Sequence, residues 1–304
     1  MRKNQALLAA LTFSIIIGLS FLFVKITLSY ENQSLILAQR FLFAFLGVII
    51  FTLIRPVKLR LTRKESINVL IISLFYPIIF FSSQILGLAQ TTVTEAGIIQ
   101  ATAPAMTVLL AAVVLKEYVQ KIQIVGILLS IAGVIFLQLM SSNGNYEFHF
   151  IGNLFIIGSI LATAIWQIMS RKATRTIAPV QITIYIISIG CIFFNAFYFM
   201  NGGEISIYIS SLKEFPYLGS ILFLGVLSTF GSSLLSIFAV SKLPVIQVSV
   251  FNNLATLITV LSGIIILQEP FHYYHVIGGI IIIIGVLIVN FKRRNKVLQK
   301  GNIK

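Results

Sequence analysis

The sequence predicts an all-α integral membrane protein, with ten transmembrane helices arranged as two inverted five-helix repeats. The first observation is composition, because 58% of the 304 residues are hydrophobic and only 10% are charged. A soluble domain carries about 25% charged residues, so this chain could not cover itself with polar surface in water. The second is a set of apolar runs without strand-like alternation, which favours helices over a membrane barrel. The third is an uneven distribution of lysine and arginine.

Ten apolar segments are each long enough to cross a hydrocarbon core of about 30 Å. They fall at 6–28, 34–54, 67–88, 96–115, 121–140, 151–170, 178–200, 216–240, 244–267 and 273–291. The longest connection, from Asn201 to Phe215, leaves no room for a soluble domain. The first run follows Arg2 and Lys3, as in a signal peptide. Because it can span the membrane and no small-residue cleavage site follows, we expect a retained first helix.

The basic residues predict the topology. With the amino terminus inside, 19 of the 22 lysines and arginines fall in cytoplasmic segments, and the outer loops hold only Lys213. Lys25 and Arg40 lie within the first two helices. The positive-inside rule therefore favours ten helices with both termini in the cytoplasm. We expect the protein to lie in the cytoplasmic membrane of the cell. The net charge of +14 is explained by this orientation, so we expect no nucleic-acid partner.

An internal repeat relates the two halves of the chain. At a fixed offset of 152 residues, Ala103–Leu137 aligns without gaps with Ala255–Val289, and the matches include Glu117 with Glu269. Gly126 and Gly133 match Gly278 and Gly285 in the same way. Because each repeat has an odd number of helices, the second would enter the membrane from the opposite side. Inverted repeats are typical of secondary transporters, although two similar hairpins without mechanistic meaning would give the same pattern.

Several stretches resemble EamA-type transporters of the drug/metabolite transporter superfamily. They are "IIGLSFLFVK" (16–25), "ILAQRFLFA" (36–44), "GLAQTTVTEAGIIQATAPAMTVLLAAVVLKE" (87–117) and "AVSKLPVIQVSVFNNLATLITVLSGIIILQEP" (239–270). The resemblance covers almost the whole chain. It implies ten helices in two inverted repeats, and export of amino acids, other metabolites or drugs. The chain departs from a symmetric pattern where Thr256 stands opposite Pro104, so we expect a kink in the fourth helix and none in the ninth.

Charged side chains within the membrane are costly and therefore candidates for a binding site. Arg40 lies about two turns into the second helix, where its guanidinium could hold a substrate carboxylate through two parallel hydrogen bonds. Bonding to helix-end carbonyls or snorkelling is the alternative. Lys25 lies near the outer end of the first helix and can snorkel more easily. At an offset of 146 it aligns with Arg171, which fits two inverted helix ends better than one site.

Uncharged polar residues form the second group of candidates. Gln100 and Asn252 occupy matching positions near the midplane, and Asn253 adds a further amide. Two matching amides favour a binding site at the interface of the repeats, although hydrogen bonds between neighbouring helices would also explain them. Trp166 lies deep in the sixth helix, away from the interfacial belt where tryptophan is usual. The other polar or aromatic candidates for a cavity are Gln39, Gln84, Gln167, Tyr185 and Asn195.

Other features have mainly structural interpretations. The paired glycines predict close helix packing, and so do the serines and Thr229 of the eighth helix, Ser228 to Ser236. Glu117 and Glu269 each end a helix, and we expect each to cap the helix that follows. Pro104 either supplies free carbonyls near a site or makes a simple packing kink.

The residues argue against several enzyme classes. The chain has no aspartate, and its eight acidic residues are glutamates away from the midplane. No phosphate-binding GxxxxGK[ST] loop is present, so ATP would not act directly. His272 and His275 could share a metal only with Glu269, and Cys191 is the single cysteine. We therefore expect no metal, no cofactor and no enzymatic activity.

Together these observations predict a secondary transporter that works by alternating access, with repeats at 1–140 and 151–304. We expect a small organic substrate with a carboxylate, such as an amino acid, because the intramembrane charges are Arg40 and Lys25. The alternatives are a multidrug efflux carrier, an integral-membrane enzyme or lipid-handling protein, a channel, or a regulatory subunit. The first helix has no glutamate, which argues against proton-coupled export of lipophilic cations. Proton or exchange coupling, the direction, and a monomeric or homodimeric state are left open.

Overall fold

The computed structural model describes residues 2–57, 59–107, 110, 121–142, 149–243, 248 and 251–291. Six of its helices are long and apolar enough to cross a membrane, and their ranges are Asn4–Leu28, Gln33–Ile54, Arg63–Gln90, Phe150–Ala173, Pro179–Met200 and Phe215–Lys242. They lie on six of the ten predicted segments. Shorter apolar helices at Ile124–Phe136, Leu254–Ile265 and Tyr273–Gly285 lie on three more. The chain is therefore an all-helical, multi-pass membrane protein.

In the first half, most helices begin at a side chain that caps them. Helix α1 (Arg2–Leu28) is followed by α2 (Gln33–Ile54), where Asn32 accepts the Leu35 N–H at 3.0 Å. Thr62 and Glu65 form a capping box at α3 (Arg63–Ser73), which continues through the π-helical segment η1 (Leu74–Ile79) into α4 (Phe80–Gln90). Thr92 caps α5 (Val93–Gln100), and α7 spans Lys121–Ser142. Each cap satisfies backbone N–H groups that would otherwise lack a partner in lipid.

The described elements of the second half are also all helices. It contains α8 (Phe150–Ala173), α9 (Pro179–Met200), and the short α10 (Ile205–Ser210) and η2 (Ser211–Lys213). Helix α11 (Phe215–Leu222) runs through the π-helical η3 (Phe223–Gly231) into α12 (Ser232–Lys242). Helices α14 (Asn252–Ile265) and α15 (Tyr273–Phe291) complete the described chain. The third long helix of each half thus carries a π-helical segment in its middle.

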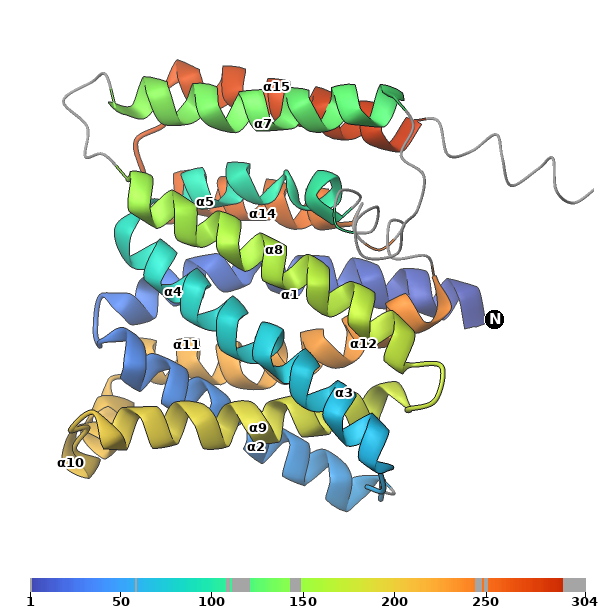
Figure 1. Cartoon of the computed structure of the whole chain (residues 1–304). Helices are drawn as coiled ribbons and strands as arrows, with labels where there is room; N and C mark the ends of the chain where they lie inside the picture. Colours follow the sequence, from blue (N-terminus) through green and yellow to red (C-terminus); the bar gives the residue numbers. More distant parts are fainter. Residues whose placement is uncertain are drawn as a thin grey trace, which may run out of the picture.

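The long helices run side by side in pairs of elements that are distant in sequence (Figure 1). Helix α7 packs on α15 at one side of the bundle, and α5 packs on α14 in the next layer. Helix α4 packs on α8, while α1 contacts both α12 and α14. Helix α2 packs on α9 at the far side. Every one of these pairs joins the first half of the chain to the second.

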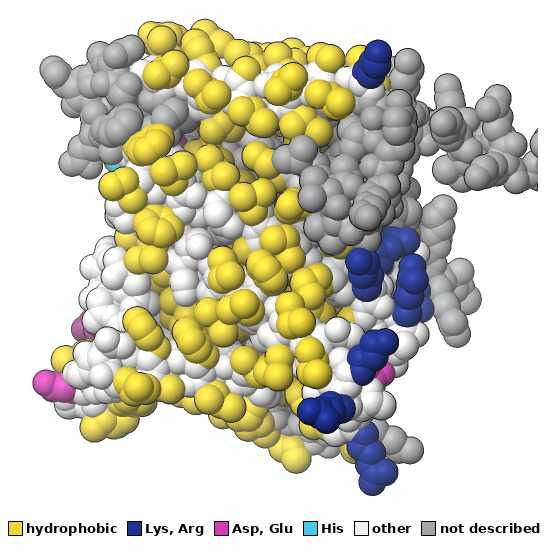
Figure 2. Space-filling model, in the orientation of Figure 1, with side chains coloured by type: hydrophobic (Ala, Val, Ile, Leu, Met, Phe, Trp, Pro, Cys, Tyr) yellow, Lys and Arg dark blue, Asp and Glu magenta, His cyan; other side chains and the backbone are white. Residues whose placement is uncertain are grey.

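Hydrophobic side chains cover the broad face of the molecule shown in Figure 2, as expected for a lipid-facing surface. Lysines and arginines gather at the edge where the amino terminus lies. We call this edge the basic end; α3 and α9 begin there, while α8 and α12 finish there, with Lys172 and Lys242 in their last turns. We call the other edge, where Lys25 ends α1, the opposite end.

The helices that were expected to meet near the membrane centre are both interrupted. After α5, Ala101 and Thr102 form a turn in which the Thr102 N–H bonds the Ile99 carbonyl at 3.0 Å, and Pro104 stands in the helix that resumes. An uninterrupted helix over 244–267 was also expected, and this prediction is wrong at Phe251. There the backbone N–H bonds the Val248 carbonyl at 3.1 Å, an i−3 bond that tightens the turn before α14.

Candidate functional site

The candidate site lies where the helix α3–η1–α4 is broken at Tyr76. Its backbone is extended, with φ −141° and ψ 109°, because Pro77 follows and excludes the helical conformation from the preceding residue. The break turns the buried Tyr76 ring onto Trp166 of α8, with centroids 4.0 Å apart and planes inclined by 13°. The Tyr76 hydroxyl lies 2.9 Å from the Ser233 hydroxyl of α12. Three helices from both halves of the chain therefore meet at one aromatic stack.

A small cavity borders this stack. Its lining includes Tyr76, Trp166, Gln84 and Gln100, with Phe13, Ile17, Phe21, Phe80 and Thr163 completing it. The volume is about 20 Å³, which is room for about one water molecule. Three residues predicted from sequence, Gln84, Gln100 and Trp166, are thus brought together. In this conformation the cavity is too small to hold a metabolite.

Several buried polar atoms lack a hydrogen-bond partner within the described part of the chain. On the helices that carry the stack they are Trp166 Nε1, both polar atoms of the Gln167 amide, and the hydroxyls of Ser170 and Ser236, and the Thr256 hydroxyl of α14 is a further one. Gln167 and Ser170 follow Trp166 on α8, while Ser236 lies one turn after Ser233 on α12. Buried polar groups in proteins are normally satisfied, so a group of unpartnered ones indicates a place for water or a ligand. Trp166 and Gln167 are each 1% exposed, and Ser170 and Ser236 are 0% exposed.

Arg40 lies fully buried beside the aromatic cluster. Its Nε donates to Thr229 Oγ1 at 2.8 Å and its Nη2 donates to Ser228 Oγ at 3.0 Å, both in η3. The guanidinium carbon lies 4.3 Å from the centre of the Phe81 ring, and that ring lies 5.1 Å from Tyr76. Across the described residues, no carboxylate lies within salt-bridge distance of Arg40. A buried cation held only by hydroxyls and a ring retains the capacity to attract an anion.

The remaining sequence candidates lie elsewhere. Gln39 has a structural position, because its amide donates to the Tyr208 carbonyl at 2.7 Å and Ser211 Oγ at 2.8 Å, and accepts from the Tyr217 hydroxyl at 2.5 Å. Tyr185 is partly buried on α9, outside the cavity lining. The side chains of Asn252 and Asn253 lie outside the described part of the structure, which places only their backbone, at the start of α14. Sequence reasoning missed Tyr76 and Phe81, although the Tyr-Pro pair within an apolar run was a readable signal.

Each end of the bundle carries a cation bound to helix-end carbonyls. At the opposite end, Lys25 Nζ donates to the Leu88 carbonyl at 2.9 Å and the Thr91 carbonyl at 2.7 Å. At the basic end, Arg171 Nη1 donates to the Leu243 carbonyl at 2.6 Å. Lys25 and Arg171 are the pair aligned by the offset of 146 residues. Each thus ties the first long helix of its half to the end of a broken helix.

Glu269 caps a different helix from the one expected. It was predicted to cap the following helix, but its carboxylate accepts the Val93 and Thr94 N–H groups of α5, each at 2.8 Å. The Thr94 hydroxyl adds a third hydrogen bond at 2.7 Å. The first turn of α5 is favourable for a carboxylate because the helix dipole is positive there. Its repeat partner Glu117 lies outside the described residues.

A second cavity at the opposite end, of about 730 Å³, includes Lys25, Glu31 and Glu269 among its lining residues. Partial burial raises the pKa of the Glu31 carboxyl in the turn between α1 and α2. This cavity is therefore lined by both positively and negatively charged side chains. The charged group beside the central aromatic stack is Arg40, which is positive.

Comparison with known proteins provides an independent test of the resemblance. The EamA-like transporter family matches this chain twice, at residues 4–139 and 150–291. The uncharacterized transporter YcxC of Bacillus subtilis is 36% identical over 99% of this chain and 97% of its own length. The uncharacterized transporter YetK of the same organism is 26% identical over 76% of this chain and 70% of that protein. A protein known from a crystal structure shares the fold, with a TM-score of 0.65, 17% identity, and coverage of 96% of this chain and 99% of that one.

Proposed function

This chain belongs to the EamA-like transporter family, and on that premise we propose that it is a secondary transporter for a small organic metabolite that carries a carboxylate. The observation that carries the proposal is Arg40, a buried cation without a carboxylate partner among the described residues. Its Thr229 and Ser228 partners are neutral, so a substrate carboxylate would add the attraction of an opposite charge and could accept two parallel hydrogen bonds. The Tyr76–Trp166 stack and the amides of Gln84 and Gln100 would contact the rest of the substrate.

The contact between α7 and α15 supports two inverted repeats. A side chain at Gly133 would meet the Gly278 carbonyl at 3.1 Å, while one at Gly285 would meet the Gly126 carbonyl at 2.6 Å. The offset of 152 exchanges these two contacts, because it relates Gly126 to Gly278 and Gly133 to Gly285. Ser130 and Ile282, which the same offset relates, lie between them and form a hydrogen bond of 3.4 Å from hydroxyl to carbonyl. A local two-fold axis through this point explains all three contacts.

The cations at the two ends support alternating access. Lys25 holds the opposite end closed and Arg171 holds the basic end closed, through the same type of bond to helix-end carbonyls. If the hydrogen bonds of one of these cations broke while those of the other remained, the central cavity would open to one side only. The helix interruptions at Ala101–Thr102 and Phe251 give each half a place to bend, and the first of them directly follows the cavity-lining Gln100. We assign the basic end to the cytoplasm by the positive-inside rule. We also propose that the substrate is exported, because export is the role that the family resemblance implies most often.

The test is transport by purified protein in proteoliposomes. A panel of amino acids and other carboxylates is measured in both directions, with and without a pH gradient, against an arm of lipophilic cations. We expect uptake or release of one carboxylate class, and a response to the gradient only if protons are coupled. Transport of lipophilic cations alone would favour the multidrug alternative, and absence of flux for every compound would contradict a carrier of these substrates.

Arg40 provides the matched variants for this experiment. Arg40→Met removes the charge and keeps an apolar side chain, and we expect flux of the carboxylate to fall at least tenfold, which corresponds to about 1.4 kcal/mol. Arg40→Lys keeps the charge but loses the planar fork, so we expect partial activity. Thermal unfolding of both variants is measured to separate binding from folding. Wild-type flux in a stably folded Arg40→Met protein would remove Arg40 from the site.

A further inference from the structure

A third cavity, separate from the central stack, opens near the basic end between α3 and α8. Its volume is about 630 Å³, and its lining combines two chemistries. Lys64 and Asn68 from α3, with Lys172 and Arg175 from α8 and the turn after it, provide polar groups. Ile72, Ile165, Ile168, Met169 and Ala173 provide an apolar wall. Such a cavity suits a ligand with an anionic head and an apolar body.

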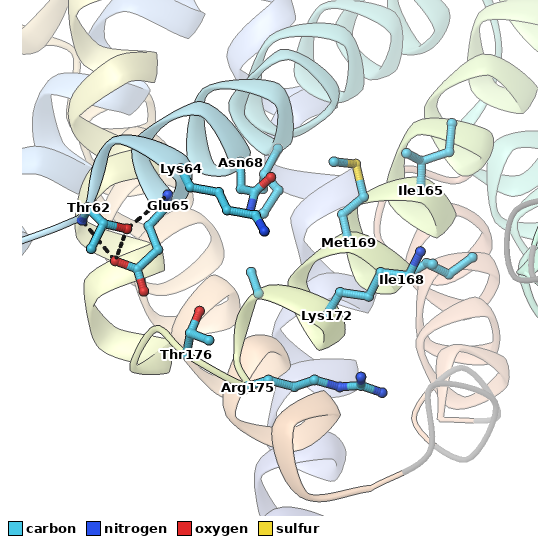
Figure 3. Close-up of a pocket in the computed structure, with 12 residues that line it drawn as sticks. Thr62, Lys64, Glu65, Asn68, Ile165, Ile168, Met169, Lys172, Arg175 and Thr176 are labelled. Carbon is cyan, nitrogen blue, oxygen red and sulfur yellow. Dashed lines mark hydrogen bonds between the residues drawn. The ribbon is translucent and has the colours of Figure 1, made fainter.

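The cations of this cavity are available to a ligand. In the parts of the chain that the structure describes, no salt bridge joins Lys64, Lys172 or Arg175 to a carboxylate. The cavity's one acid, Glu65, is occupied by the capping box, where its Oε2 accepts the Thr62 N–H and hydroxyl, each at 2.8 Å. Figure 3 shows Glu65 directed at Thr62, while Lys64 and Asn68 extend toward α8. These basic side chains therefore line the cavity without a carboxylate partner among the described residues.

The position of the cavity selects a membrane ligand. Its cations lie where α3 begins and α8 ends, at the level where helices leave the hydrocarbon core. On α3, the face beside the cavity continues into exposed apolar side chains, with Ile67 50% exposed and Leu70 58% exposed, so lipid reaches this helix. Deeper in, Ile72 and Ile168 are buried and form the floor. A phospholipid could place its phosphate among the cations and an acyl chain along Ile165 and Met169.

We propose that the cavity between α3 and α8 binds an anionic phospholipid of the leaflet at the basic end. Basic pockets between transmembrane helices on the cytoplasmic side are suited to anionic head groups, and each lysine or arginine near the membrane surface adds about 1 kcal/mol of attraction. The apolar wall distinguishes this cavity from a simple cluster of basic residues at the membrane surface, for which the positive-inside rule is a sufficient explanation. The bound lipid would fill the gap between a helix of each repeat.

The test is lipid retention by the purified full-length protein, measured by native mass spectrometry. Phosphatidylglycerol and phosphatidylcholine with identical acyl chains are titrated onto the wild type and onto a triple variant, Lys64→Gln with Lys172→Gln and Arg175→Gln. The control triple, Arg55→Gln with Arg63→Gln and Lys242→Gln, removes the same charge outside the cavity lining. We expect the affinity for phosphatidylglycerol to fall at least tenfold in the cavity triple and less than twofold in the control. Equal losses in the two triples would overturn the proposal, as would equal retention of the two lipids.

Two further arms keep the test decisive. Met169→Trp fills the cavity and leaves every charge in place, so it should also lower phosphatidylglycerol retention, even if the triple variant folds poorly. Unchanged retention in this variant would overturn the proposal. Millimolar inorganic phosphate and glycerol phosphate are added as competitors. Failure of both to displace the lipid supports a lipid site, whereas full displacement would assign the cavity to a soluble anion instead.

Discussion

At the scale of single residues, the site depends on groups that the surrounding helices leave unsatisfied. Trp166 is almost completely buried, yet its Nε1 has no acceptor among the described residues. Its ring is held by stacking on Tyr76, which fixes where that N–H points. A buried donor costs free energy unless a partner is supplied, so under the proposed function this N–H is available to water or substrate. Arg40 is a second such group, because it is buried and charged and has no carboxylate partner among the described residues.

The indole N–H can be tested without disturbing the stack. We expect Trp166→Phe to preserve an aromatic contact with Tyr76 and to raise the KM for the carboxylate substrate by up to about tenfold, because one hydrogen bond contributes about 1 kcal/mol. The measurement is concentration-dependent flux in proteoliposomes. Tyr185→Phe, which removes a hydroxyl away from the cavity lining, is the control and should leave the KM unchanged. An unaltered KM in Trp166→Phe would mean that the indole N–H does not contact substrate.

At the scale of secondary-structure elements, the broken helices are the distinctive feature. The middle of the third long helix in each half is π-helical, at Leu74–Ile79 and Phe223–Gly231, and both segments border the site. The first supplies Tyr76 and the second supplies Ser228 and Thr229 to Arg40. Ser228 and Thr229 of this second segment, expected to serve helix packing, also hydrogen-bond a charged side chain. π-Helical segments are frequent at functional sites because they redirect side chains and backbone carbonyls.

The start of α5 depends on an acid from the other half of the chain. Glu269→Gln keeps the shape of the side chain and removes its charge from the positive end of the helix. We expect a loss of about 1 kcal/mol in the free energy of unfolding, measured as a lower thermal unfolding temperature in detergent. Glu214→Gln, an exposed acid of the same end without a capping hydrogen bond, should have little effect. Equal stability of the two variants would show that the cap contributes nothing.

At the scale of the whole molecule, two cations occupy corresponding places at opposite ends. We expect Lys25→Met to favour the state open at the opposite end, and Arg171→Met the state open at the basic end, because each removes one set of bonds to helix-end carbonyls. The measurement uses Thr163→Cys, a cavity-lining position, in a Cys191→Ser background. Membrane-impermeant thiol labelling is then compared from the two sides. Increased labelling from the same side in both variants would contradict the assignment of the two ends.

Sequence-based prediction succeeded for the long helices and the family, and it failed for two structural details. The apolar runs located the six helices that are long enough to span in the part of the chain that the structure describes, because burial in lipid demands continuous hydrophobicity. The family resemblance is confirmed by the match over both halves of the chain. The expectation of an intact helix around Phe251 was wrong, since a local i−3 bond leaves no mark in composition. Glu269 caps α5 instead of its sequence neighbour α15, and only the meeting of distant segments could show this.

The membrane environment, the places of the long helices, the asymmetry of charge between the two ends, and the family could all be inferred from the amino-acid sequence. These properties depend on composition and on the order of apolar segments, which the chain carries locally. Which polar residues lie together became visible in the tertiary structure. It placed Gln84, Gln100 and Trp166 around one cavity, and it assigned Gln39 to a structural bond network. The physical reason is that hydrogen bonds and ring contacts act over a few ångströms, so partners far apart along the chain are chosen by packing.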